Sequence, residues 1–150
     1  MNTTFSAEDR KAWMSLLASA DEARLTKLWQ SCGIDPDCEF LRAPEAGGVM
    51  VRGRIGGSGA PFNLGEMTVT RCALSLADGT VGHGYVQGRS KAKAIVAAKI
   101  DALMQTRAAE TLRAEVLEPL AGERQAQKDA RAAKAAATKV EFFTMVRGED

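Results

Sequence analysis

The chain has few residues of the kinds that enzymes use for catalysis. Its only histidine is His83, and its three cysteines are Cys32, Cys38 and Cys72. A catalytic zinc usually takes three protein ligands that lie close together, but five residues separate Cys32 from Cys38 and the other two groups are isolated in the sequence. Cys72 and His83 could meet on neighbouring strands as a nucleophile and its base. We expect ordinary packing for both, and neither a metal nor a cofactor in this chain.

Four arginines are better candidates, because guanidinium groups bind phosphates and carboxylates through paired hydrogen bonds. Arg52 and Arg54 alternate on one face of an expected strand, and Arg71 on the expected neighbouring strand could join them. Arg89 comes just before a helix expected from Ser90, where free N–H groups favour an anion. We predict that these arginines bind phosphate or a partner's carboxylates. Ion pairs within the chain and plain solvent exposure are the alternatives.

The composition limits the kind of protein that carries these residues. With 150 residues, of which 45% are hydrophobic and 26% charged, we expect a globular protein with one hydrophobic core. No stretch approaches the roughly 18 apolar residues that span a bilayer, and the first residues do not resemble a secretory signal. We therefore expect a cytoplasmic protein with free thiols and no membrane partner. The formal net charge of +1 argues against a dedicated nucleic-acid binder.

The elements that must position these residues begin with two helices. Ser6 can cap a segment at residues 7–18 whose apolar residues recur at helical spacing, and Asp21 can cap a second that ends at Gly33. Strands follow at residues 38–42, 49–55, 67–76 and 80–87, where apolar and polar residues alternate or β-branched residues dominate. Residues 43–48 contain a proline and two glycines, which is typical of a hairpin loop. We expect a four-stranded antiparallel sheet.

The C-terminal part is expected to be helical. One helix runs from Ser90 to about residue 106, and a second apolar stripe is interrupted near Pro119. Residues 121–139 contain no large apolar side chain but many strong helix formers, so they predict a helical arm roughly 25–29 Å long. The predicted fold is α+β: two N-terminal helices, a four-stranded antiparallel sheet, C-terminal helices and an extended tail. Residues 1–120 would form a single domain, and residues 121–150 the arm and tail.

An apolar segment follows the predicted arm. The tail residues that we expect to act in assembly are Val140, Phe142, Phe143, Met145, Val146 and Arg147. Burial of each large apolar side chain would stabilise a contact by about 1.5–3 kcal/mol. The tail could dock into another subunit or exchange within a dimer. It could instead add a strand to its own sheet, and the sequence leaves both arrangements open.

Several short motifs carry a resemblance to a known family. They are Trp13-Met14, Val-Met-Val-Arg-Gly-Arg at residues 49–54, Gly-Glu-Met-Thr-Val-Thr-Arg at 65–71, Gly88-Arg89 before a helix that ends Asp101-Ala102-Leu103, and Val-Glu-Phe-Phe-Thr-Met-Val-Arg-Gly at 140–148. Together they resemble the PhnG family of the carbon-phosphorus lyase system. The similarity extends in order from about Arg10 to Gly148.

The resemblance implies a subunit of a core complex with PhnI, PhnH and PhnJ, with a second PhnG chain as a further candidate partner. In that family the complex, a transferase of phosphonate catabolism, joins a phosphonate to the ribose of ATP and releases adenine. The product is a ribose 1-phosphonate 5-triphosphate. ATP would be a substrate of the complex, and catalysis is associated with PhnI and PhnJ. We therefore expect this chain not to be catalytic alone.

Three functions remain open at this point. The chain could support assembly of the complex, or it could contribute substrate-binding arginines to a shared active site. A third reading rests on the order of one helix, three strands and one helix, which superficially resembles a double-stranded RNA-binding domain. The near-neutral charge and the lack of a concentrated lysine cluster weigh against RNA.

Overall fold

The first two helices begin at side chains that cap free backbone groups. The computed structural model describes residues 5–140. Before α1 (Ala7–Ser19), the Ser6 hydroxyl accepts a hydrogen bond from the Asp9 N–H, and the Asp9 carboxylate accepts one from the Ser6 N–H. Asp21 caps α2 (Glu22–Cys32), which ends at Gly33 in the left-handed conformation. Both predicted helices are confirmed.

The sheet contains three antiparallel strands rather than the four that we predicted. They are β1 (Cys38–Arg54), β2 (Pro61–Leu76) and β3 (Val81–Gln87), in the order β1-β2-β3. β1 continues through residues 43–48, so the predicted hairpin loop there is wrong. The α+β class holds, with two predicted strands merged into one.

Irregular pairing explains how β1 accommodates residues that are typical of a loop. Its register with β2 shifts between Phe40 and Arg42 and again between Arg42 and Glu45, so that extra residues of β1 bulge out of the ladder. Pro44 lies within the second shift. β1 is also an edge strand, and edge strands and bulges tolerate the missing N–H of proline. The bulges therefore let one strand pass where the sequence predicts a turn.

The helix α3 (Lys91–Leu103) packs on β3 at a very short distance. A Cβ atom added to Gly84 would lie 2.1 Å from the Ala94 carbonyl oxygen, and one added to Gly82 would lie 2.1 Å from that of Ala98. The two glycines are two residues apart and therefore share the helix-facing side of β3. Their missing side chains allow the backbones of strand and helix to approach.

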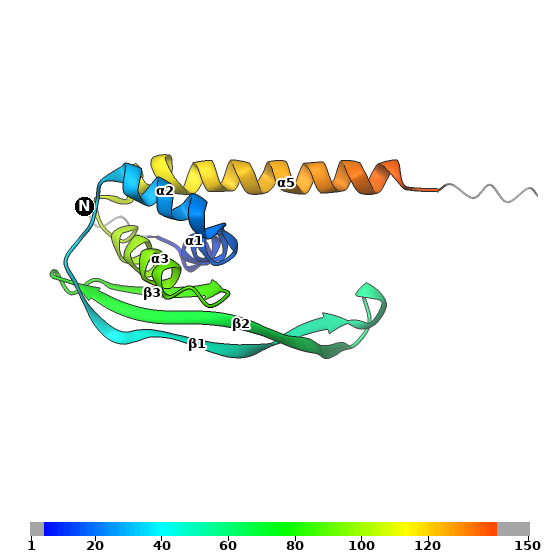
Figure 1. Cartoon of the computed structure of the whole chain (residues 1–150), viewed down its shortest axis with the longest axis horizontal. Coiled ribbons are helices and arrows are strands. Elements are labelled where there is room, and N and C mark those ends of the chain that lie inside the picture. The colour runs from blue at the N-terminus through cyan, green and yellow to red at the C-terminus, as the bar shows by residue number, and fades with distance from the viewer. Residues whose placement is uncertain (1–4, 141–150) are drawn as a thin grey trace, which may run out of the picture.

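The C-terminal helices follow α3 through α4 (Ala109–Leu112) and the π-helical turn η2 (Arg113–Leu117). α5 (Glu118–Ala137) continues from η2 without a break, and Pro119 comes just after this π-helical turn. Leu120 is its one buried residue. In Figure 1 α5 crosses above the other helices and extends past them, toward the same side as the far ends of β1 and β2.

The core lies between the helices and one face of the sheet (Figure 1). Its fully buried side chains include Leu17, Leu25, Leu74, Ile100 and Leu112. Within residues 5–140, no helix is both long and apolar enough to cross a membrane.

Beyond this core, β1 and β2 continue as a two-stranded extension (Figure 1). We call residues 48–68 the ribbon: it comprises the ends of β1 and β2 and the short helix η1 (Ile55–Gly57) near its tip. β3 pairs with β2 only from Val69 to Ser75. The ribbon therefore has no third strand.

Candidate functional site

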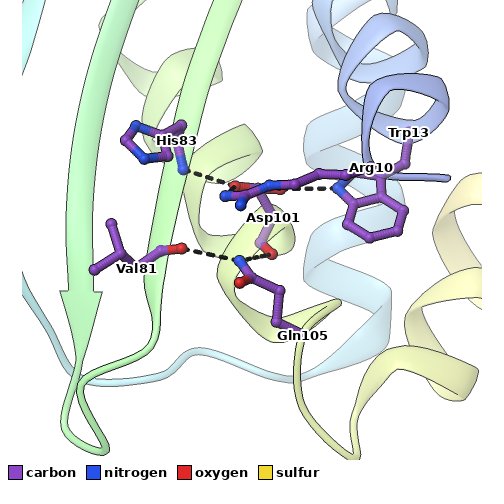
Figure 2. A network of polar contacts seen from close by, with 6 residues as sticks. All are labelled: Arg10, Trp13, Val81, His83, Asp101 and Gln105. Carbon is purple, nitrogen blue, oxygen red and sulfur yellow. Dashed lines mark hydrogen bonds and ion pairs between the residues drawn. The ribbon is translucent and has the colours of Figure 1, made fainter. Parts of the chain in front are cut away.

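A buried carboxylate joins three elements at the centre of the molecule. The Asp101 side chain is fully buried on α3. It accepts hydrogen bonds from Arg10 Nε (3.1 Å) and Nη2 (2.7 Å), from the Trp13 ring N–H (2.9 Å) and from the His83 backbone N–H (2.8 Å). Figure 2 shows these groups converging from α1 and β3. We call this cluster the Asp101 node.

The polar groups of the Asp101 node form hydrogen bonds with other groups of the same chain. The Asp101 carboxylate raises the pKa of Arg10 by hydrogen bonding to its charged guanidinium. Next to it, the Gln105 amide donates to the carbonyls of Val81 (2.9 Å) and Asp101 (3.0 Å) (Figure 2). A carboxylate with four donors has no free position at which to accept a substrate proton. The node is therefore suited to holding α1, α3 and β3 together rather than to acid–base chemistry.

Lys93 is the other buried charged residue that could do chemistry. Burial lowers its pKa, while the nearby Glu22 and Asp21 oppose that shift. Its ammonium group donates to the Ala18 carbonyl at 3.1 Å, near the C-terminal end of α1. A cation favours the negative end of a helix dipole. This hydrogen bond explains why a lysine is buried here: Lys93 holds α3 to α1.

The structure separates the cysteine and histidine that could have formed a catalytic pair. Cys72 is buried and its thiol donates to the Ala94 carbonyl at 3.2 Å, whereas the His83 side chain is exposed. In the sheet register His83 lies opposite Ala73, so it and Cys72 occupy opposite faces. Burial also raises the pKa of the Cys72 thiol. Among residues 5–140, no three His, Cys, Asp or Glu side chains group closely enough to hold a metal.

The expectation that Arg71 joins Arg52 and Arg54 is wrong. Arg71 lies opposite Glu45, whereas Arg52 lies opposite Asn63, about 26 Å further along the sheet. The Glu45 carboxylate accepts hydrogen bonds from Arg71 Nε at 2.9 Å and from Arg42 Nη1 at 3.1 Å. Arg71 therefore has an internal partner.

The surroundings of Arg89 are less suited to an anion than the sequence suggested. Ser90 caps α3 by accepting a hydrogen bond from the Lys93 N–H, as expected. Its hydroxyl also donates to the Glu22 carboxylate at 2.5 Å. An acidic side chain of the chain itself thus already lies at the start of this helix. Arg89 is exposed and remains a predicted anion or partner contact.

Among the hollows on the surface of residues 5–140, two lie beside residues considered above. A groove of about 500 Å³ runs between α1 and α5; Trp13, Leu16 and Leu117 are among its apolar residues, and Arg113 and Lys128 among its charged ones. A smaller hollow of about 200 Å³ lies on the sheet and includes Arg71, Glu45 and Tyr85. Asp9 and Glu118 also line the groove, but Asp9 is engaged in the cap of α1. Among the described residues, no histidine lines either hollow.

A family comparison identifies the chain. Residues 8–148 match the family model described as phosphonate metabolism protein PhnG. The chain belongs to the PhnG family. A PhnG relative from Rhizobium meliloti (strain 1021) is 46% identical over 141 residues, which cover 94% of this chain and 90% of the relative. That relative is named alpha-D-ribose 1-methylphosphonate 5-triphosphate synthase subunit PhnG.

Among residues 5–140 of this PhnG chain, the Asp101 side chain has the most hydrogen-bond partners, and the sequence indicated it only within a family motif. Asp101 follows Ala94, Ala97 and Ala98 on the buried side of α3, and an acidic residue on such a face requires buried partners. The position of Asp101 on this apolar face is the sequence signal that could have identified it as a buried carboxylate with partners. Of the predicted assembly tail, Val140 is described and exposed, whereas Phe142, Phe143, Met145, Val146 and Arg147 lie outside the described residues.

Proposed function

We propose that this chain is a non-catalytic subunit of an α-D-ribose 1-methylphosphonate 5-triphosphate synthase and that it supports assembly of the complex. The exposed helix α5 carries the proposal. It has 20 residues, of which one is buried. Helices in proteins gain most of their stability from packing an apolar face. A long helix that packs almost no apolar face against its own chain is well suited to reach a partner.

The reaction that the subunit would support joins a phosphonate to the ribose of ATP and releases adenine. The family membership and the relative's name support this assignment. We propose PhnI, PhnH and PhnJ as the other subunits, of which PhnI and PhnJ would supply the catalytic groups. Asp101 and Lys93 form hydrogen bonds within this chain, which is consistent with catalytic groups that come from the other subunits. ATP and the phosphonate would bind to the complex.

Deleting residues 140–150 is expected to reduce co-purification with PhnI at least tenfold. The deletion removes five large apolar side chains, each worth about 1.5–3 kcal/mol when buried, and about 1.4 kcal/mol changes an equilibrium tenfold. The measurement is the subunit ratio after affinity capture of the co-expressed complex. Deletion of residues 148–150 alone is the control. Capture of PhnI in full stoichiometry by the longer deletion would show that the tail is not the docking segment.

Changing Arg71 or Arg89 to alanine is expected to leave turnover of the assembled complex within about twofold of the wild type. Arg71 already pairs with Glu45, and a carboxylate lies at the helix start that follows Arg89. The measurement is adenine release per assembled complex. A large fall in turnover with assembly intact would instead support the shared active site and contradict a purely supporting role.

A further inference from the structure

The ribbon lies outside the folded core on both faces. Every residue of β2 from Pro61 to Met67 is exposed. The β2 edge that β3 covers further along is open here, because β3 pairs with β2 only from Val69. An isolated two-stranded antiparallel ribbon is marginally stable in water. A ribbon of this length therefore gains from a surface that covers it.

The ribbon also concentrates exposed apolar side chains. Of the nine large hydrophobic residues exposed within residues 5–140, five belong to it, with exposed fractions from 37% to 66%. They are Met50, Ile55, Phe62, Leu64 and Met67. Single exposed apolar residues are ordinary, whereas apolar residues that share one face can form an interaction surface.

Two faces of different character can be assigned near the ribbon tip. A Cβ atom on Gly53 would lie 3.5 Å from the Phe62 ring and 3.8 Å from the Leu64 Cβ, so these residues share one face. Arg52 and Arg54 flank Gly53 in the strand and therefore point to the opposite face. Neither arginine forms an ion pair with a described residue. The tip thus has an apolar side and a basic side.

The charge of the ribbon indicates which partner covers it. The ribbon (residues 48–68) contains Arg52 and Arg54 near its tip and one acidic residue, Glu66, further from the tip, so the tip itself is basic. Two copies of the chain joined through these tips would bring like charges together, which opposes association. A different chain could contact both faces if it had an apolar groove for the apolar side and carboxylates beside the groove for the basic side.

We propose that the ribbon inserts into an apolar groove of another synthase subunit, with Phe62 and Leu64 in the groove and Arg52 and Arg54 paired with carboxylates at its rim. The inference rests on the proposed function, because the partner is a subunit of that complex. It concerns a contact separate from the C-terminal tail. The ribbon and the tail would hold the partner subunits independently.

The apolar contact is tested in the full-length chain co-expressed with the other synthase subunits. The variant Phe62→Ser/Leu64→Ser is expected to lower the captured amount of at least one subunit about tenfold or more. The matched control is Phe40→Ser/Leu41→Ser, which changes the same residue types at similarly exposed positions of β1 outside the ribbon; its capture should stay within about twofold. Equal capture by the two variants would overturn the proposal.

The basic face is tested by Arg52→Glu/Arg54→Glu, with Arg107→Glu as the control at an exposed site outside the ribbon. The double variant should weaken capture, and the difference from wild type should shrink as salt is raised. A photo-reactive amino acid in place of Leu64 should cross-link to another subunit of the assembled complex. Cross-linking to a second copy of this chain, or to no chain, would overturn the proposal even if the serine variants fail to fold.

The outcomes separate this inference from the proposed function. If the wild-type chain fails to co-purify with synthase subunits, the proposed function fails. If it co-purifies and the ribbon variants bind as it does, only the ribbon contact fails.

Discussion

Replacing Asp101 with alanine is expected to lower the free energy of unfolding by about 3–5 kcal/mol. The carboxylate is fully buried and accepts hydrogen bonds from Arg10, Trp13 and the His83 backbone. Without it, the Trp13 and His83 N–H groups lose their acceptor, and each unsatisfied buried group costs about 1–3 kcal/mol. Arg10 would lose its ion pair at the same time.

Urea unfolding of the isolated chain, followed by tryptophan fluorescence, measures this effect. Asp37→Ala is the control, because Asp37 is exposed and such changes usually stay within about 0.5 kcal/mol. Asp101→Asn should fall between the two, since an amide keeps one acceptor oxygen but loses the charge. If Asp101→Ala is no more destabilising than the control, the Asp101 node does not hold α1 to α3.

Replacing Gly84 with alanine is expected to destabilise the fold by about 3 kcal/mol. The added Cβ would lie 2.1 Å from the Ala94 carbonyl oxygen and 3.0 Å from the carbonyl carbon of the same residue. These are backbone atoms of α3 that cannot rotate away as a side chain would. The helix must shift from the sheet, which loosens the packing around it.

Thermal unfolding measures this change against Gly65→Ala. Gly65 also lies in a strand, β2, but nothing lies within 4 Å of a Cβ atom added there. For a chain of this size, 3 kcal/mol corresponds to a fall in Tm of about 6–12 °C. Similar Tm values for the two variants would mean that α3 can move away from β3 at little cost.

Much of the fold follows from local signals in the sequence. Ser6, Asp21 and Ser90 each cap a helix as predicted, because capping depends on a few adjacent residues. The continuity of β1 could not be predicted from local signals, because Pro44 and the glycine pair at residues 47–48 are typical of a turn. They are accommodated by bulges in an edge strand, and that depends on pairing with β2.

The candidate site was less predictable because it depends on register and on distant contacts. Neighbouring short strands could bring Arg71 beside Arg52, but the pairing of the longer β1 with β2 puts Glu45 opposite Arg71 instead. The Asp101 node joins groups that lie far apart along the chain, and no local pattern encodes which of them meet. Helical spacing predicted the helix after Ser90, yet it did not identify the partners of its one carboxylate.

The Asp101 node also determines the order in which the protein can be completed during synthesis. Its hydrogen bonds from Arg10 and Trp13 join residues separated by 91 and 88 positions. Contacts of such long sequence separation form late, because a large loop must close first. When the nascent chain has emerged from the ribosome only as far as β3, it still lacks Asp101. α1 therefore cannot form its hydrogen bonds to Asp101 until α3 has also emerged. The first helix to be made is therefore among the last to be fixed in place.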